Sequence, residues 1–162
     1  MPKIVLGIDP GIADTGYGII SEESGKISCL VYGTIKTLST QSLPNRLTTL
    51  YTELDKIIKK YKPQFTAVEQ LFFNKNVRTA LIVGQARGVA LLALANNKLP
   101  IVEFTPSQVK QAVSSYGKAS KAQVQKMVKM ILKLDKLPQP DDAADALAVA
   151  ICALNSCSYL KK

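Results

Sequence analysis

Hydrophobic and polar positions in the first part of the chain predict extended structure. Residues 3–9 form a short, apolar, β-branched run, which predicts a buried strand. Residues 9–16 contain Asp, Pro and Gly and predict a turn. Two further apolar segments, 16–23 and 27–36, flank Ser24-Gly25-Lys26, a sequence typical of a hairpin connection. We therefore expect three consecutive strands in an antiparallel meander.

The pattern changes to a helical period at residue 43. Leucine, isoleucine and tyrosine side chains form one apolar stripe over residues 43–61, which predicts an amphipathic helix. Pro63 ends this helix because proline cannot continue the backbone hydrogen bonding. Residues 64–70 then predict another buried strand, and Glu69 lies at its end.

Residues 76–97 predict a long helix whose side chains are apolar almost all round. A helix of this kind lies either in the centre of a protein or in an interface. Gly84 and Gly88 are four residues apart and would let a neighbouring backbone approach closely. The residues alone leave two interpretations open, an internal helix or one that seats a two-fold partner and makes a homodimer.

The remaining segments predict one more strand and three more helices. Residues 100–104 predict the strand, and Thr105-Pro106 is typical of a helix start. Residues 120–134 predict an amphipathic helix, with lysines on the face opposite its valine, methionine and isoleucine side chains. The last helix is expected within residues 139–154.

The order of predicted elements, βββ-α-β-α-β-α-α-α, indicates an α/β protein. We expect one mixed five-stranded sheet flanked by helices on both faces. The length of 162 residues suits one domain. We expect residues 1–157 to form that single domain and residues 158–162 to be a short C-terminal tail.

Composition narrows the classes of function. The chain has 21 Lys plus Arg against 12 Asp plus Glu, a net charge of +9, which favours a polyanionic partner such as nucleic acid or an anionic membrane surface. It has no histidine, which excludes Ser-His-Asp and Cys-His catalysis, a histidine base and histidine-bound zinc. If the protein is an enzyme, its catalytic groups must therefore be side chains other than histidine.

Cysteine usage and hydropathy bear on the compartment. The three cysteines form no C-x-x-C pair, and their odd number does not suit a disulfide framework. Unbroken apolar runs such as Val89 to Ala95 are far shorter than the ~20 residues of a membrane span. We expect a cytoplasmic protein with no membrane segment.

Two carboxylates on the last helix need a particular explanation. Acidic residues are favoured in a first helical turn by the helix dipole, which explains Asp141 and largely explains Asp142. It explains Asp145 poorly, because that residue lies a turn further along among apolar neighbours. A buried carboxylate without a partner is costly and usually is paired or binds a metal. Asp142 and Asp145 are three apart and project to the same side of the helix.

Two further acids lie at strand ends. Asp9 closes the first strand and has an alternative role as a turn residue before Pro10-Gly11. Glu69 closes the fourth strand and has an alternative role as a surface charge. If these acids meet Asp142 and Asp145, the cluster requires a cation, and oxygen ligands without His or Cys select Mg²⁺ or Mn²⁺. Two such ions about 4 Å apart catalyse in-line phosphoryl displacement by activating water and stabilising the leaving oxygen.

Six motifs together resemble one family. In the order in which they occur, these are "GIDPGIADTGYGII", "VEQLFFNKN", "GQARGVALLA", "PSQVKQAV", "SKAQVQKMV" and "DDAADALAVAI". Their order and spacing resemble those of the bacterial RuvC-type Holliday-junction resolvases, over nearly the whole chain. "GIDPG" alone is a weak signal, whereas the six together are highly specific.

The resemblance implies an RNase H-like fold, a homodimer and Mg²⁺-dependent nicking of four-way DNA junctions. Two symmetric cuts would leave ligatable 5′-phosphate and 3′-hydroxyl ends. The family also implies two metal ions per active site with Mn²⁺ as a substitute, short preferred cleavage sequences, and cooperation with a branch-migration motor complex of the RuvA and RuvB type. The family's catalytic and metal-binding acids fall on Asp9, Glu69, Asp142 and Asp145. Some members have His at the position of Asp142.

Three further residues are candidates for DNA binding. Phe72 follows Glu69 closely, and the resemblance implies that its ring contacts unpaired bases at a junction, although core packing is the ordinary role of a phenylalanine. Lys110 and Lys121 flank the Ser/Gly-containing loop 114–120. The resemblance implies phosphate contacts for both, whereas lysines commonly are just solvated.

Three other functions remain open from the residues alone. An actin-like ATPase or sugar kinase uses a similar strand-Asp-Gly loop, but it needs two such domains around its nucleotide. A DNA-binding module without catalysis would not need all four acids. A nuclease for duplex RNA or an RNA-DNA hybrid uses the same fold, and only the six motifs favour junction DNA.

Overall fold

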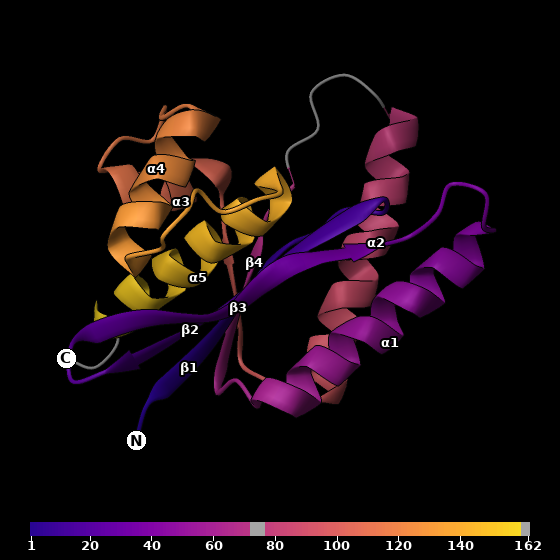
Figure 1. Ribbon diagram of the computed structural model, residues 1–162. Helices are drawn as coiled ribbons and strands as arrows, with labels where there is room; N and C mark the ends of the chain where they lie inside the picture. Colours follow the sequence, from indigo (N-terminus) through magenta and orange to yellow (C-terminus); the bar gives the residue numbers. More distant parts are fainter. Residues whose placement is uncertain (72–76, 160–162) are drawn as a thin grey trace.

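The computed structural model describes residues 1–71 and 77–159, with side chains described as far as residue 156. At its centre lies a five-stranded sheet with the order β3-β2-β1-β4-β5 (Figure 1). The strands are β1 (Lys3–Asp9), β2 (Asp14–Glu23), β3 (Lys26–Lys36), β4 (Phe65–Glu69) and β5 (Ile101–Phe104). β1, β2 and β3 pair antiparallel, whereas β4 pairs parallel with both β1 and β5. The sheet is therefore mixed, and the expected meander is present.

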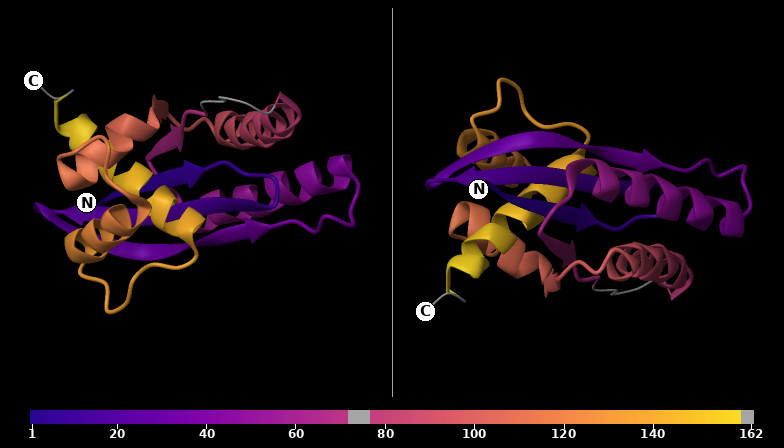
Figure 2. Two further views of the ribbon diagram at one scale, coloured as in Figure 1. Left: turned by 90° about the horizontal axis from the view of Figure 1, so that it is seen from above. Right: turned by 90° about the horizontal axis from the view of Figure 1, so that it is seen from below.

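Helices cover both faces of the sheet (Figures 1 and 2). One face carries α1 (Leu43–Tyr61) and α2 (Val77–Asn96), and the other carries α3 (Pro106–Ser114), α4 (Lys121–Leu132) and α5 (Asp141–Tyr159). The alternation of side chains along β1 divides the core in the same way. Val5 packs with residues of α5, whereas Leu6 and Ile8 pack with α1 and α2.

The central helix α5 lies directly on the sheet. Almost every side chain from Ala143 to Leu154 is buried, and Asp145 is the exception within that run. Gly7 of β1 and Gly18 of β2 are opposite each other in the ladder. A Cβ at Gly7 would lie 2.2 Å from the carbonyl oxygen of Ala146, so a side chain at this position would push the helix away. The glycines of the sheet and the alanines of α5 thus let the helix pack close to the sheet, in which β1 ends at Asp9 and β4 ends at Glu69.

The sequence-based boundaries need two adjustments. The expected turn at 9–16 is shorter, because β2 begins at Asp14. The hydroxyl of Thr15 donates to the carbonyl oxygen of Gly11, and the amide of Thr37 donates to the carbonyl of Ala13 at 3.0 Å. These bonds shorten the turn in a way that turn composition does not reveal. The last helix extends to Tyr159, beyond the expected residue 154.

Two capping boxes fix the helices beside the acidic strand ends. The Thr105 hydroxyl accepts from the Gln108 amide at the start of α3, and the Gln108 side chain accepts from the Thr105 amide. Ser120 and Gln123 make the same reciprocal pair at the start of α4. Such pairs satisfy amides that have no partner within the helix, so both helix starts are well defined.

Candidate active site

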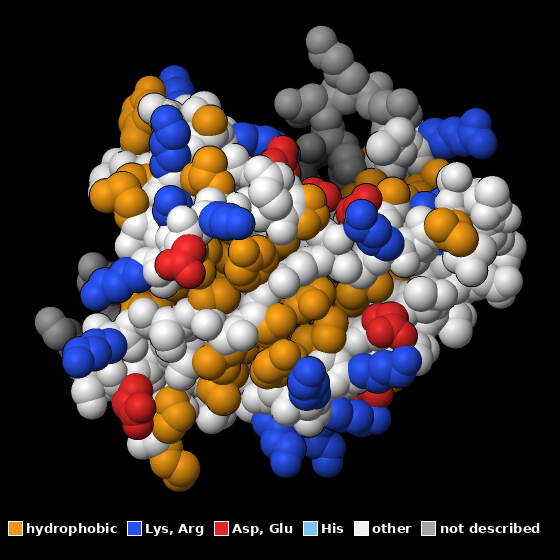
Figure 3. Space-filling model, viewed as in Figure 1, with side chains coloured by type: hydrophobic (Ala, Val, Ile, Leu, Met, Phe, Trp, Pro, Cys, Tyr) orange, Lys and Arg blue, Asp and Glu red, His pale blue; other side chains and the backbone are white. Residues whose placement is uncertain are grey.

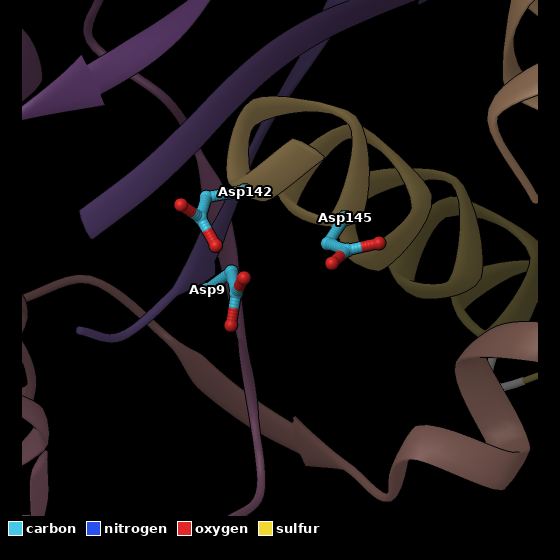
Figure 4. Close-up of side chains that lie close together, drawn as sticks. All are labelled: Asp9, Asp142 and Asp145. Atoms are coloured by element: carbon cyan, nitrogen blue, oxygen red, sulfur yellow. The ribbon is translucent and has the colours of Figure 1, made fainter. Parts of the chain in front are cut away.

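The predicted acids meet at one edge of the central strands. Asp9 is the last residue of β1 and Glu69 is the last residue of β4. These neighbouring strands are parallel, so their carboxyl ends lie at the same edge of the sheet. The first turns of α5 cross this edge and bring Asp142 and Asp145 to it (Figure 4).

Three of the four carboxylates are close enough to share a cation. One carboxylate oxygen from each of Asp9, Asp142 and Asp145 lies within 4.8 Å of the others, and all three side chains are half-buried (Figure 4). Glu69 is not within this 4.8 Å group, but it lines the same hollow as Asp9 and Asp145. The structure therefore gives a compact triad with Glu69 at its side.

Two other acids lie near the triad and differ in role. Asp141 is exposed and accepts a hydrogen bond from the Gln125 side chain of α4 at 2.7 Å. Its side chain therefore contacts a neighbouring helix, an interaction that its place in the first helical turn did not predict. Asp14, at the start of β2, lies near enough to raise the pKa of Asp142. Asp14 falls within the stretch 9–16 that the sequence predicts as a turn, so no local pattern marks it as a strand residue near the acids.

Burial and like charge raise the pKa values of these carboxyls. Burial raises the pKa of Asp9 to about 8, and the charges of Glu69, Asp145 and Asp142 act in the same direction. Burial and the charge of Asp145 raise the pKa of Glu69 to about 7. The pKa values of Asp142 and Asp145 are also raised, in each case mainly by burial. The metal-free cluster thus stores unfavourable electrostatic energy that a cation would relieve.

Two lysines lie beside the cluster. A hollow of about 260 Å³ is lined by Asp9, Glu69 and Asp145 together with Lys110 of α3 and Lys121 of α4. The Lys121 ammonium lies 3.5 Å from a carboxylate oxygen of Asp145. Asp145 raises the pKa of Lys121, and both lysines lower the pKa of Glu69. In Figure 3 acidic side chains gather near the upper middle of the surface, with basic side chains around them.

The donor set of the cluster fits a hard divalent cation. All its ligand atoms are carboxylate oxygens, which Mg²⁺, Mn²⁺ and Ca²⁺ prefer over softer metals. The raised pKa values show that the protein alone does not neutralise these charges. The residues present therefore suit a metal centre.

The remaining predicted site residue is Phe72, which lies outside the described residues. The apolar helix predicted at 76–97 corresponds to α2 (Val77–Asn96), which exposes part of its apolar surface. Val77 is 76% exposed, Leu81 65% and Leu92 53%. Among the described helices, α2 alone is long and apolar enough to cross a membrane by length and composition, a test that helices of other kinds also pass.

A mixed sheet in this order, with an acidic cluster under the C-terminal helix, defines an RNase H-like α/β protein. Comparisons with known proteins then give the family. The family model for crossover junction endodeoxyribonuclease RuvC matches residues 5–153. This chain belongs to the RuvC family.

Individual relatives agree over almost the full length of the chain. The crossover junction endodeoxyribonuclease RuvC of Alkaliphilus oremlandii is 59% identical over 149 residues, which are 92% of this chain and 91% of that protein. The protein of the same description from Ruminiclostridium cellulolyticum is 56% identical over 153 residues, 94% of this chain and 92% of that protein. Thermus thermophilus RuvC in complex with Holliday junction substrate has a TM-score of 0.92 at 32% identity, covering 97% of this chain and 96% of that one.

Proposed function

We propose that this chain is a metal-dependent endonuclease that resolves four-way DNA junctions by paired symmetric cuts. The single observation that carries the proposal is the triad of Asp9, Asp142 and Asp145, with carboxylate oxygens within 4.8 Å, in a chain of the RuvC family. The net charge of +9 suits a DNA substrate. The products would be 5′-phosphate and 3′-hydroxyl ends, made during recombination and repair.

The four acids take the role of metal ligands in this proposal. Asp9, Asp142 and Asp145 would hold Mg²⁺ or Mn²⁺ directly, and Glu69 would complete the site from the adjacent strand. When bound there, a pair of such ions would supply an activated water for attack on phosphorus and charge stabilisation for the leaving 3′-oxygen. The chain itself fixes the ligands on a sheet and a helix, which keeps their positions precise.

The two lysines take the role of phosphate contacts. Lys110 and Lys121 lie at the wall of the acidic hollow, so a scissile phosphate placed there would meet both ammonium groups. They offset the negative charge that phosphate and carboxylates would otherwise accumulate. Lys121 already contacts Asp145, which orients it toward the cluster before DNA arrives. Phe72 is proposed to contact bases at the junction.

The homodimer is proposed to form through α2. Its exposed residues Val77, Leu81 and Leu92 fall on one side of the helix, at spacings of four and eleven residues. Gly84 and Gly88 lie between them, and a Cβ at either position would meet nothing within 4 Å. This open apolar strip suits a second copy of the same helix, and a two-fold partner would present two active sites to a two-fold substrate.

The cellular setting follows from the same proposal. A junction resolvase acts on chromosomal DNA in the bacterial cytoplasm, and the proposed dimer would cover the apolar side of α2. Cooperation with a branch-migration motor of the RuvA and RuvB type is part of this proposal. A nuclease for RNA-DNA hybrid uses the same fold, so the substrate needs a direct test.

The test compares substrates and a matched pair of variants. End-labelled four-way junction, linear duplex and RNA-DNA hybrid are incubated with Mg²⁺ or with EDTA. Asp145→Asn removes one charge from the triad, whereas Asp141→Asn removes one charge from the neighbouring acid that bonds Gln125. We expect paired nicks in the junction only, lost with EDTA and with Asp145→Asn and retained with Asp141→Asn.

Other results would indicate a different function for the protein. Tight junction binding without cuts under any metal condition would leave a binding module. Cleavage of the hybrid in preference to the junction would place the chain with a different group of nucleases. Full activity of Asp145→Asn would remove the triad from the mechanism.

A further inference from the structure

The contact between β2 and the first turn of α5 is unusually close. Gly16 lies directly opposite Asp9 in the antiparallel β1–β2 ladder. Directly opposed residues of an antiparallel pair face the same side of the sheet. Gly16 therefore faces α5 beside Asp9, and it is buried.

This position has no room for a side chain. A Cβ at Gly16 would lie 1.9 Å from the carbonyl oxygen of Asp142, 2.5 Å from its carbonyl carbon and 3.2 Å from the amide nitrogen of Ala143. All three atoms belong to the helix backbone, so no side-chain rotation could relieve the overlap. The turn that carries Asp142 would have to move by more than about 1 Å to restore ordinary van der Waals separation.

We propose that Gly16 is a positioning residue for the metal centre, because its lack of a side chain sets how closely the Asp142 turn approaches Asp9. This inference rests on the proposed metal-dependent function. Mg²⁺ requires near-octahedral geometry with oxygen ligands at about 2.0–2.1 Å. A displacement of one ligand by more than about 1 Å is larger than that geometry tolerates. Gly16 thus controls the metal centre without contacting a ligand atom of the metal.

Gly18 under α5 provides a matched comparison. A Cβ at Gly18 would lie 2.8 Å from both the amide nitrogen and the Cδ2 of Leu147. These contacts fall further along α5 than Asp142 and Asp145, whereas a Cβ at Gly7 would lie 2.2 Å from the carbonyl oxygen of Ala146, directly after Asp145. Substitution of Gly18 disturbs helix packing away from the ligand turn, so Gly18 separates loss of packing from loss of metal geometry.

The experiment measures metal binding and folding separately, on the full chain without DNA. Mn²⁺ affinity is measured by electron paramagnetic resonance titration, and metal-free stability by thermal unfolding in EDTA. We expect Gly16→Ala to weaken Mn²⁺ binding by about 10- to 100-fold, the usual effect of losing support behind a metal ligand. We expect Gly18→Ala to lower the unfolding temperature and to keep the wild-type Mn²⁺ affinity.

A longer side chain at position 142 tests whether the lost Mn²⁺ affinity of Gly16→Ala can be restored. If the turn has moved away from Asp9, Asp142→Glu adds one methylene that returns the carboxylate toward the cluster. The double variant Gly16→Ala with Asp142→Glu should therefore bind Mn²⁺ more tightly than Gly16→Ala. A general loss of structure would not be repaired in this way, so failure of the rescue would count against the inference.

The outcomes separate this inference from the proposed function. Wild-type Mn²⁺ affinity in folded Gly16→Ala would overturn the inference and leave the proposed function intact. Absence of Mn²⁺ binding by the wild-type chain would overturn the metal centre itself. If Gly16→Ala does not fold, Gly18→Ala decides. Loss of Mn²⁺ binding by Gly18→Ala would overturn the inference, because the centre would then depend on packing of the whole helix, and wild-type Mn²⁺ affinity in a destabilised Gly18→Ala would support it.

Discussion

Burial and neighbouring negative charges both raise the pKa of Asp9. Its pKa rises from an ordinary value of 3.8 to about 8, because it is buried and close to Glu69, Asp145 and Asp142. The folded, metal-free protein therefore holds a proton on this carboxyl at pH values where the unfolded chain has lost it. The free energy of unfolding falls as pH rises between these two pKa values. A site built for metal thus destabilises the metal-free fold.

This sign predicts a stabilising substitution in the active site. In EDTA at pH 8, Asp9→Asn should raise the free energy of unfolding by at least about 1 kcal/mol, or roughly 2–4 °C in unfolding temperature. At pH 5 the gain should be clearly smaller, and it should vanish only below pH 3.8, where the Asp9 carboxyl is protonated in both the folded and the unfolded chain. Thermal unfolding at both pH values measures the difference. A loss of stability at pH 8 would contradict the assignment of Asp9 to an uncompensated acidic cluster.

At the scale of elements, the start of α4 connects the acidic cluster to the basic surface. The capping box of Ser120 and Gln123 fixes this helix start, and Lys121 follows immediately. Its ammonium lies 3.5 Å from Asp145 although the side chain is 65% exposed. The contact alone contributes little to stability, since ion pairs with an exposed partner typically are worth about 0–1 kcal/mol. The contact matters because it holds the positive charge of Lys121 beside the acidic cluster.

A binding measurement distinguishes Lys121 from an ordinary surface lysine. Log affinity for junction DNA falls with log salt, and Lys121→Ala should make this slope shallower by about one unit, which corresponds to the loss of one phosphate contact. The same substitution should also slow cleavage. Lys126→Ala, on the same helix but outside the acidic hollow, should leave the cleavage rate unchanged. An unaltered slope and rate for Lys121→Ala would show that this lysine is only solvated.

At the scale of the whole molecule, α2 leaves an apolar strip exposed on the side away from the sheet. It packs on the sheet through Ala86, Ala90, Ala93 and Leu94, and Arg87 forms an ion pair with Glu103 of β5 at 2.6 Å. The opposite side carries Val77, Leu81 and Leu92 in solvent. One helix thus presents two apolar sides, only one of which the chain itself covers.

The dimer proposal predicts a specific change in oligomeric state. Leu81→Glu should convert a dimer to a monomer in sedimentation at micromolar concentration, because it places a charge in the proposed interface. Met130→Glu is the matched control, since Met130 is 69% exposed on α4, far from α2 in the fold. It should leave the dimer intact. A monomeric wild-type chain, or a dimeric Leu81→Glu, would remove α2 as the interface.

The sequence by itself determined the elements and the candidate chemistry. Hydrophobic periodicity is a local property, so it located the strands and helices to within a few residues. The absence of histidine and the acids at strand ends and on the last helix favoured an oxygen-ligand metal centre, since ligand preference depends on residue type. The six motifs identified the family, which the family model confirms. The roles of the individual site residues stay predictions.

Tertiary structure alone decided how these residues meet. The sequence placed Glu69 equally with the other acids, but sheet register and helix position put it beside a triad of Asp9, Asp142 and Asp145. Asp14 came near Asp142 only because the turn before β2 is short. Gly16 has no room for a side chain because α5, which begins more than 120 positions later in the chain, packs directly against it. Contacts between distant segments depend on packing, which no local pattern encodes.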